Sequence, residues 1–194
     1  MFGGLGWAYL DDDDQLSPTY VEASLRALKK HHAVLMPTIY VNESGDVLRT
    51  LGRSNSPVSI PSFALDLGSM HAVCRPEILP KWQEGFAEDV IHTCEVIDRL
   101  GGLIEMDQSA SYFATIRSGS VCAASLKIDE AYQRLIASPF GTMTSSGSDS
   151  LRRLFAFRRA VNTLYESSGH EVDYHTFVLN NSAGFDKSPL YSAS

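Results

Sequence analysis

Residues 80–107 read PKWQEGFAEDVIHTCEVIDRLGGLIEMD, and this stretch decides the fold. Its apolar residues recur at steps of four or three, the spacing of one side of an α-helix: Trp82, Phe86, Val90, Cys94 and Ile97. Pro80 suits the first helical turn, where its missing N–H needs no partner. The glycines at 101–102 suit a helix end. The stretch therefore predicts a helix over residues 80–101, which needs a core to lie on, and a short strand over residues 103–107.

The composition is that of a globular chain with ample material for a core. Of its 194 residues, 44% are hydrophobic and 20% are charged, which predicts one large domain or one domain with an appendage. The formal net charge is −7. This acidic balance argues against a surface that coats nucleic acid in general, but it leaves room for a local basic stripe.

The cysteines and the hydropathy pattern indicate the cellular compartment in which we expect this protein. Cys74, Cys94 and Cys122 are widely spaced and form no C-x-x-C pair, so we expect free thiols rather than a zinc or redox motif. Free thiols indicate the cytoplasm or another reducing intracellular compartment. The sequence shows no leader-like segment and no apolar run long enough to span a bilayer, so we expect no membrane insertion.

The remaining patterns complete an α+β fold, with about three main helices packed on a small, mostly antiparallel sheet that contains two hairpins. Further helices are expected over residues 18–30, 129–137 and 149–167, and strands over residues 33–40, 47–51, 112–116, 121–126 and 172–179. We expect residues 1–138 to form an α+β core domain and residues 139–148 a linker. Residues 149–194 would then supply a helix, a strand and a tail that pack on the core.

The only basic cluster lies in the helix expected after the linker. It consists of Arg152, Arg153, Arg158 and Arg159, interleaved with Phe155 and Phe157. Arginine forks bind phosphates and aromatic rings stack on bases, so this helix is a candidate nucleic-acid contact. The alternative is that the phenylalanines belong to the core and the arginines pair with the surplus carboxylates.

Glu88, His92 and Glu95 have the spacing of one helix face. Carboxylates and an imidazole so placed can share a metal, but no other helix supplies a matching Glu-x-x-His. A charged face in contact with solvent is the simpler interpretation.

The carboxylates Glu43, Asp89 and Asp107, with the strand-like residues 37–42 and 103–106, resemble the pattern of PIN-domain nucleases over about residues 7–110. These are small α/β proteins in which clustered carboxylates hold Mg²⁺ or Mn²⁺ for RNA cleavage. The resemblance implies that Glu43, Asp89 and Asp107 are metal ligands. The family's first aspartate has no counterpart near the N-terminus of this chain.

A second resemblance runs along the whole chain. The order of Phe2 and Trp7, the segment 56–58, the arginine helix and a tail of small residues is similar to that of rod-shaped plant virus coat proteins. Those subunits are acidic and mostly helical, and they bind RNA through a few arginines inside an assembly.

Three functional hypotheses follow. The first is a non-catalytic, coat-like or complex subunit that needs no cofactor and acts through contacts with a protein partner or with copies of itself, its tail over residues 180–194 packing on the partner. The alternative is a PIN-like Mg²⁺- or Mn²⁺-dependent ribonuclease. The third is an enzyme that binds a small molecule in a pocket lined by His71, His92 or His175.

Overall fold

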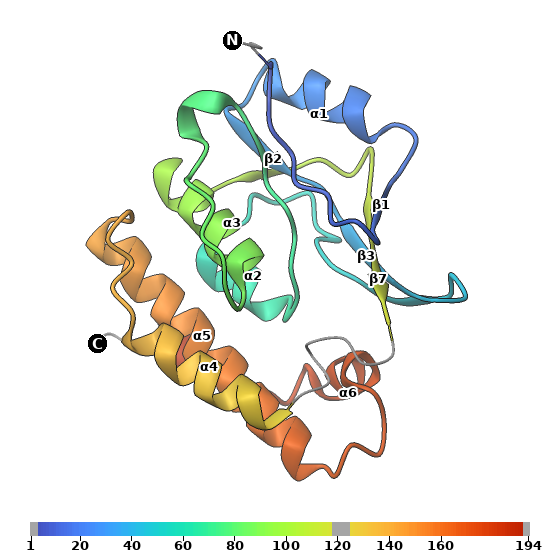
Figure 1. The fold of residues 1–194 in the computed structure, drawn as a ribbon, viewed down its shortest axis with the longest axis vertical. Helices are drawn as coiled ribbons and strands as arrows, with labels where there is room; N and C mark the ends of the chain where they lie inside the picture. The colour runs from blue at the N-terminus through green and yellow to red at the C-terminus, as the bar shows by residue number, and fades with distance from the viewer. Residues whose placement is uncertain (1–3, 118–124, 192–194) are drawn as a thin grey trace.

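The computed structural model describes residues 4–117 and 125–191 and shows an α+β fold built on two small mixed sheets (Figure 1). The elements, in chain order, are β1 (Gln15–Leu16), α1 (Tyr20–Leu28), β2 (Ala33–Leu35), β3 (Thr38–Asn42), β4 (Val47–Thr50), α2 (Ile60–Leu65), β5 (Val73–Cys74), a 3-10 turn (Pro76–Ile78), α3 (Glu88–Arg99), β6 (Glu105–Met106), β7 (Tyr112–Ile116), α4 (Ser125–Ala137), α5 (Ser145–Ser167), α6 (Tyr174–Asn181) and α7 (Ser188–Tyr191). The fold class expected from the sequence is confirmed.

Each of the two sheets contains one parallel pair of strands. β2 pairs with β6 in the sheet of order β5-β2-β6, and β3 pairs with β7 in the sheet of order β1-β7-β3-β4. The pairing opens between Leu35↔Met106 and Thr38↔Tyr112, where residues 107–111 lie opposite only Met36 and Pro37. Pro37 has no N–H to donate, which suits a break in the ladder. The longer of the two segments, residues 107–111, therefore bulges out between the two sheets.

The first expected hairpin is confirmed and the second is not. β3 and β4 are antiparallel, and Gly45 takes φ +85° in the turn that joins them. β7 has β1 and β3 as its neighbours instead of a following strand. Ser125 and Leu126, expected at the end of a strand, begin α4, while residues 121–124 lie outside the described residues. The sheets are therefore mixed, with two parallel pairings beside the antiparallel ones.

The helix expected over residues 80–101 is shorter than its apolar spacing predicts. α3 begins at Glu88 because Gly85 and Ala87 have φ values of +144° and +60°, which no right-handed helix accommodates. Trp82 and Phe86 consequently precede the helix. Every residue from Val90 to Ile97 is buried, so α3 lies inside the molecule.

The C-terminal region is helical where a strand was expected. The strand predicted over residues 172–179 is wrong, because Asp173 caps α6 by accepting from the backbone N–H groups of His175 and Thr176. α5 begins at Ser145, within the expected linker, after Thr144 as its N-cap. In the tail, Leu190 of α7 is buried in the core cluster that also contains α5. The chain itself therefore holds the tail as far as Tyr191.

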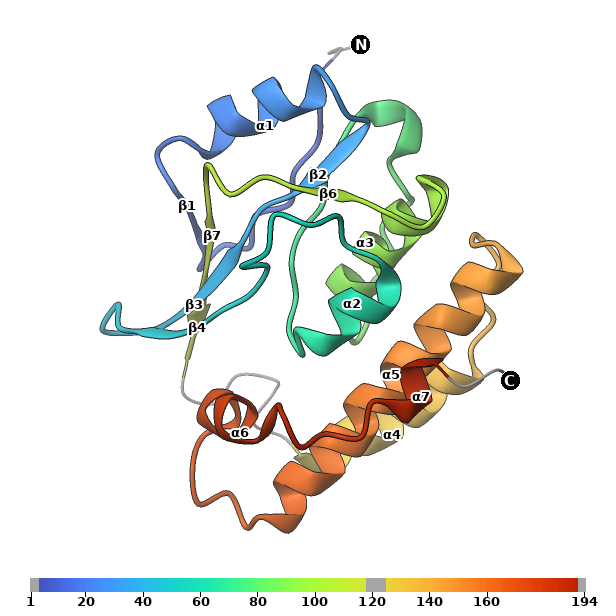
Figure 2. The ribbon, with the colours of Figure 1, turned by 180° about the vertical axis from the view of Figure 1, so that it is seen from behind.

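The helices form layers on either side of the strands. α1 covers one side, while α4 and α5 run side by side along the other, with α2 and α3 between them and the strands (Figures 1 and 2). One cluster of buried side chains extends from β2 through α2, α3 and α5 to α7, and a smaller one lies under α1. The core of residues 33–116 is thus continuous with that of the C-terminal helices.

Candidate functional site

The three carboxylates of the expected metal site lie on separate elements. Glu43 is exposed in the β3–β4 turn, which projects from the body of the molecule (Figures 1 and 2). Asp89 lies in the first turn of α3, and Asp107 directly follows β6. Among residues 4–117 and 125–191, no group of three or more His, Cys, Asp or Glu side chains is arranged to hold a metal ion. The structure therefore does not bring Glu43, Asp89 and Asp107 together.

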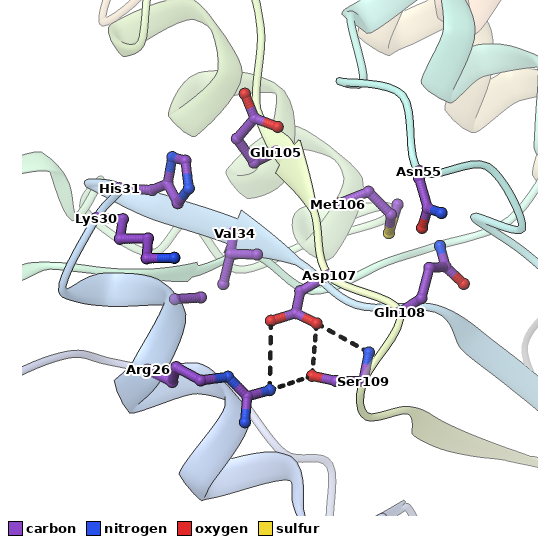
Figure 3. Close-up of a pocket in the computed structure, with 11 residues that line it drawn as sticks. Arg26, Lys30, His31, Val34, Asn55, Glu105, Met106, Asp107, Gln108 and Ser109 are labelled. Atoms are coloured by element: carbon purple, nitrogen blue, oxygen red, sulfur yellow. Dashed lines mark hydrogen bonds and ion pairs between the residues drawn. The ribbon is translucent and has the colours of Figure 1, made fainter.

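Asp107 instead lines a pocket of about 430 Å³ beside the end of α1 (Figure 3). The walls come from the C-terminal half of α1, from β2 and β6, and from the bulge between β6 and β7. The lining residues are Arg26, Ala27, Lys30, His31, Val34, Asn55, Glu105, Met106, Asp107, Gln108 and Ser109. We call this cavity the α1 pocket. It exists because the parallel pairing opens at this point.

The polar groups at the base of the α1 pocket satisfy one another. Ser109 donates to Asp107 Oδ1 from its backbone N (2.8 Å) and from Oγ (2.5 Å). Arg26 Nη2 donates to Ser109 Oγ (2.6 Å) and lies 3.9 Å from Asp107 Oδ2. Gln108 Nε2 donates to the backbone oxygens of Gly52 and Ser54, which fixes the loop opposite. This arrangement orients a polar surface, but it does not pair Ser109 with an imidazole base as nucleophilic catalysis needs.

The arginine helix is α5, and its four arginines do not form one exposed basic face. Arg152 donates to Asp149 (2.9 Å), and Arg159 binds Asp129 of α4 through two hydrogen bonds (2.6 and 3.1 Å). The Arg159 guanidinium lowers the pKa of Asp129. Arg153 is half-buried, and Arg158 is only 6% exposed. The phenylalanines, Phe155 and Phe157, are both in the core, as the alternative interpretation of this helix required.

Arg158 belongs to a second cluster, which lies between β4, α2, α5 and α6. Its Nη2 donates to the Gly68 oxygen (2.5 Å), and Nη2 of Arg49 on β4 donates to the neighbouring Leu67 oxygen (2.8 Å). Backbone N–H of the next residue, Ser69, donates to the Tyr40 hydroxyl (2.8 Å). The segment 67–69 after α2 therefore receives both guanidinium groups and the phenol, and we call this set the arginine cluster.

Two rings complete the arginine cluster. The His175 imidazole of α6 lies 4.8 Å from the Tyr40 ring, and the Arg49 guanidinium lies 5.5 Å from the same ring. Burial, together with the nearby Arg49 charge, lowers the pKa of His175 to about 4. The imidazole is therefore neutral at pH 7, and Arg49 and Arg158 carry the positive charge of the cluster.

The charged face expected on α3 is mostly withdrawn from solvent, since two of its three residues are buried and Glu88 alone is partly exposed. His92 is buried and packs against Tyr9 and Trp82, with ring centroids 4.7 and 5.3 Å away. Burial lowers its pKa to about 4. Glu95 is buried as well and accepts hydrogen bonds from Gln83 and Thr142. Both side chains thus connect α3 to the irregular segments that cover it.

Sequence reasoning missed the arginine cluster because its members come from distant segments. The one usable signal is the register of the β3–β4 hairpin, which places Arg49 opposite Tyr40 and on the same face of the sheet. Nothing in the local sequence of Arg158 or His175 distinguishes a buried side chain from an exposed one.

Comparison with known families finds no family model that matches the chain, and comparison with curated proteins finds no significant match. Neither the PIN-domain nor the coat-protein resemblance gains support from this source. In the described part of the chain, no helix combines the length and the apolar character needed to cross a bilayer.

Proposed function

We propose that this chain is a non-catalytic subunit that acts through protein contacts, and that its partner is a second copy of itself. The observation that carries the proposal is the outer face of α1. Val21 is 62% exposed and Leu25, one turn later, is 39% exposed. Because the opposite side of α1 packs on its own small core, these two apolar side chains have no intramolecular use.

The N-terminal arm carries further exposed apolar side chains. The backbone of Trp7 forms hydrogen bonds in both directions with that of Cys74, which fixes the arm along the β5 edge. Gly6 is packed so closely on Leu28 that a side chain there would collide with it. The side chains of Leu5 and Trp7 nevertheless remain exposed. An ordered, exposed apolar surface of this kind is typical of a protein contact.

The charges beside Val21 and Leu25 favour self-association. Glu22 and Lys29 are exposed on the same side of α1, two helical turns apart. If two α1 helices cross antiparallel about a two-fold axis near Leu25, Glu22 of each copy faces Lys29 of the other. The surface is therefore complementary to itself, as an isologous interface requires.

Light scattering over a range of protein concentrations tests the proposal. We expect a dimer for the natural chain and a monomer for Leu25→Glu, because the new carboxylate would be buried at the axis. Leu164→Glu is the matched control, since Leu164 is an exposed leucine on α5 and its replacement should leave the dimer intact.

A charge exchange makes the test specific for the two-fold arrangement. Glu22→Lys should weaken the dimer by bringing lysines together, and adding Lys29→Glu should restore it. A natural chain that stays monomeric at all concentrations would overturn the proposal. A dimer that Leu25→Glu leaves unchanged would place the contact elsewhere and would equally overturn the assignment to α1.

The buried thiols support a reducing intracellular location for this subunit. Cys74 and Cys94 are both buried and unpaired, and burial raises the pKa of Cys74 to about 11. The ribonuclease alternative has less support, because among the described residues no group of three or more such side chains is arranged to hold a metal ion. It predicts RNA cleavage that requires Mn²⁺ and is lost in Asp89→Asn and Asp107→Asn.

A further inference from the structure

The two guanidinium groups of the arginine cluster are buried without an ion-pair partner. Arg49 is 5% exposed and Arg158 is 6% exposed. Neither forms an ion pair within the described residues, although six arginines elsewhere in this part of the chain lie within 4.0 Å of a carboxylate oxygen: Arg26, Arg75, Arg117, Arg134, Arg152 and Arg159. Removing a charge from water is unfavourable unless an opposite charge and hydrogen bonds replace the water. Within the described residues, the two guanidinium charges are therefore not balanced by a direct ion pair.

Several polar atoms of the cluster are buried and have no hydrogen-bond partner. They are Nε and Nη1 of Arg49, Nε of Arg158, Oγ of Ser69 and Nδ1 of His175. Each guanidinium uses Nη2 on a backbone oxygen, as described above, while the buried N–H groups just named have no partner. Buried donors are paired in nearly all native structures, so a set of unused donors indicates a bound acceptor.

These donors approach from four separate segments: β4, α5, α6 and the residues that follow α2. Asp66 is one nearby carboxylate; burial raises its pKa, while the Arg49 and Arg158 charges lower it. Asp89 and Asp173 also act on the rings of the cluster, Asp89 on Tyr40 and Asp173 on His175. Among the described residues, however, no carboxylate lies within ion-pair distance of either guanidinium group, so their unused N–H groups lack an anionic acceptor. A carboxylate ligand has two oxygens and would be saturated by a single arginine fork, whereas a phosphate offers oxygens in several directions.

We propose that the arginine cluster is a phosphate-binding site, with Arg49 and Arg158 as the charged ligands and Ser69 and His175 as further hydrogen-bonding groups. The ligand is inorganic phosphate or the phosphate group of a small monoester, because the unused donors belong to one small cluster of neighbouring side chains. The half-buried residues Asp66, Gly68 and Ser69 form the solvent side of the site. Leu67 holds φ +49°, a conformation that leucine rarely adopts and that turns two successive backbone oxygens toward the arginines.

The experiment measures thermal unfolding of the full chain at constant ionic strength, with chloride replaced stepwise by inorganic phosphate. A ligand that binds only the folded state raises the unfolding temperature. We expect a saturable rise of about 5 °C for the natural chain. A parallel titration with glycerol phosphate separates the two ligand sources: a tighter response to the monoester assigns the site to a phosphorylated small molecule, and a tighter response to phosphate assigns it to the free ion.

Matched variants on one helix locate the site. Arg158→Met should abolish the response to phosphate, whereas Arg152→Met, the same change at a half-exposed position of α5, should keep it. Ser69→Ala is a milder variant that folds if Arg158→Met does not, and it should weaken binding about tenfold. An absent response to both phosphate and the monoester in the natural chain overturns the proposal, as does an equal loss of response in Arg152→Met and Arg158→Met. These outcomes do not depend on the α1 contact, because the variants leave α1 untouched.

Discussion

The α1 pocket and the arginine cluster both contain arginine side chains, but the two regions differ in the partners that they offer to the guanidinium charge. In the α1 pocket, Arg26 is half-exposed and is matched by Asp107 and Ser109 at 3.9 and 2.6 Å. In the arginine cluster, two buried guanidinium groups have no carboxylate within ion-pair distance among the described residues, and they leave buried N–H groups unused. An arginine with an internal partner explains local structure, whereas the buried arginines without an ion-pair partner are the basis of the phosphate site that we propose.

The largest expected effect comes from removing the carboxylate of the arginine cluster. In phosphate-free buffer, Asp66→Asn should lower the free energy of unfolding by about 2–3 kcal/mol, because the carboxylate charge that acts on both buried guanidinium groups is then lost. Urea unfolding measures the change. Asp149→Asn, which removes the half-exposed partner of Arg152, should lower it by less than about 1 kcal/mol. Equal losses of stability in the two variants would mean that the buried arginines of the cluster depend on their carboxylate no more than the half-exposed Arg152 does, which would contradict the prediction.

The second effect is a loss of stability in acid. His92 and His175 have pKa values of about 4 in the folded chain, below the ordinary value near 6.5. Between these values the unfolded chain binds more protons, so stability is complete above pH 6.5 and falls as the pH drops toward 4. Each histidine should remove about 1.4 kcal/mol per pH unit in this window. His175→Gln should reduce the slope of the unfolding free energy against pH, measured by urea unfolding at pH 4.5–6.5, by the contribution of one histidine. An unchanged slope would contradict the burial of the His175 imidazole.

A smaller effect is expected in the α1 pocket. Ser109→Ala removes the hydroxyl that joins Arg26 to Asp107 and should lower the free energy of unfolding by about 1 kcal/mol. The phosphate response of the arginine cluster should stay unchanged in this variant. A loss of that response would mean that the two regions are coupled, which their separate positions in the fold do not predict.

The smallest effect is expected at the α4–α5 ion pair. Arg159→Met breaks the contact with Asp129, but both side chains are more than one-third exposed and water replaces the lost hydrogen bonds. The urea midpoint should therefore shift by no more than the experimental error. A clear loss of stability would show that this pair holds α4 on α5, a role we assign to the apolar side chains between them.

The sequence correctly predicted those helices and turns whose ends depend on neighbouring residues in the chain. The helix expected over residues 18–30 appears as α1, and the β3–β4 hairpin forms where Gly45 supplies the positive φ that its turn needs. The expected strand over residues 172–179 failed because its apolar residues suit a short helix equally well. The cap at Asp173 decided between the two structures. The start of α3 failed because the backbone at Gly85 and Ala87 reverses direction within an otherwise helical pattern.

The candidate sites depended on long-range packing and were largely beyond prediction. Asp107 was singled out from the sequence as a metal ligand, yet in the fold its partners are Ser109 and Arg26. Arg158 was singled out as a surface contact, yet it is buried against segment 67–69. The sequence by itself determined the α+β class, the amphipathic helices and the first hairpin, because these follow from residue spacing within a few turns of chain. Only the tertiary structure decided which charges are paired, since a charge finds its partner through contacts between segments that spacing along the chain does not encode.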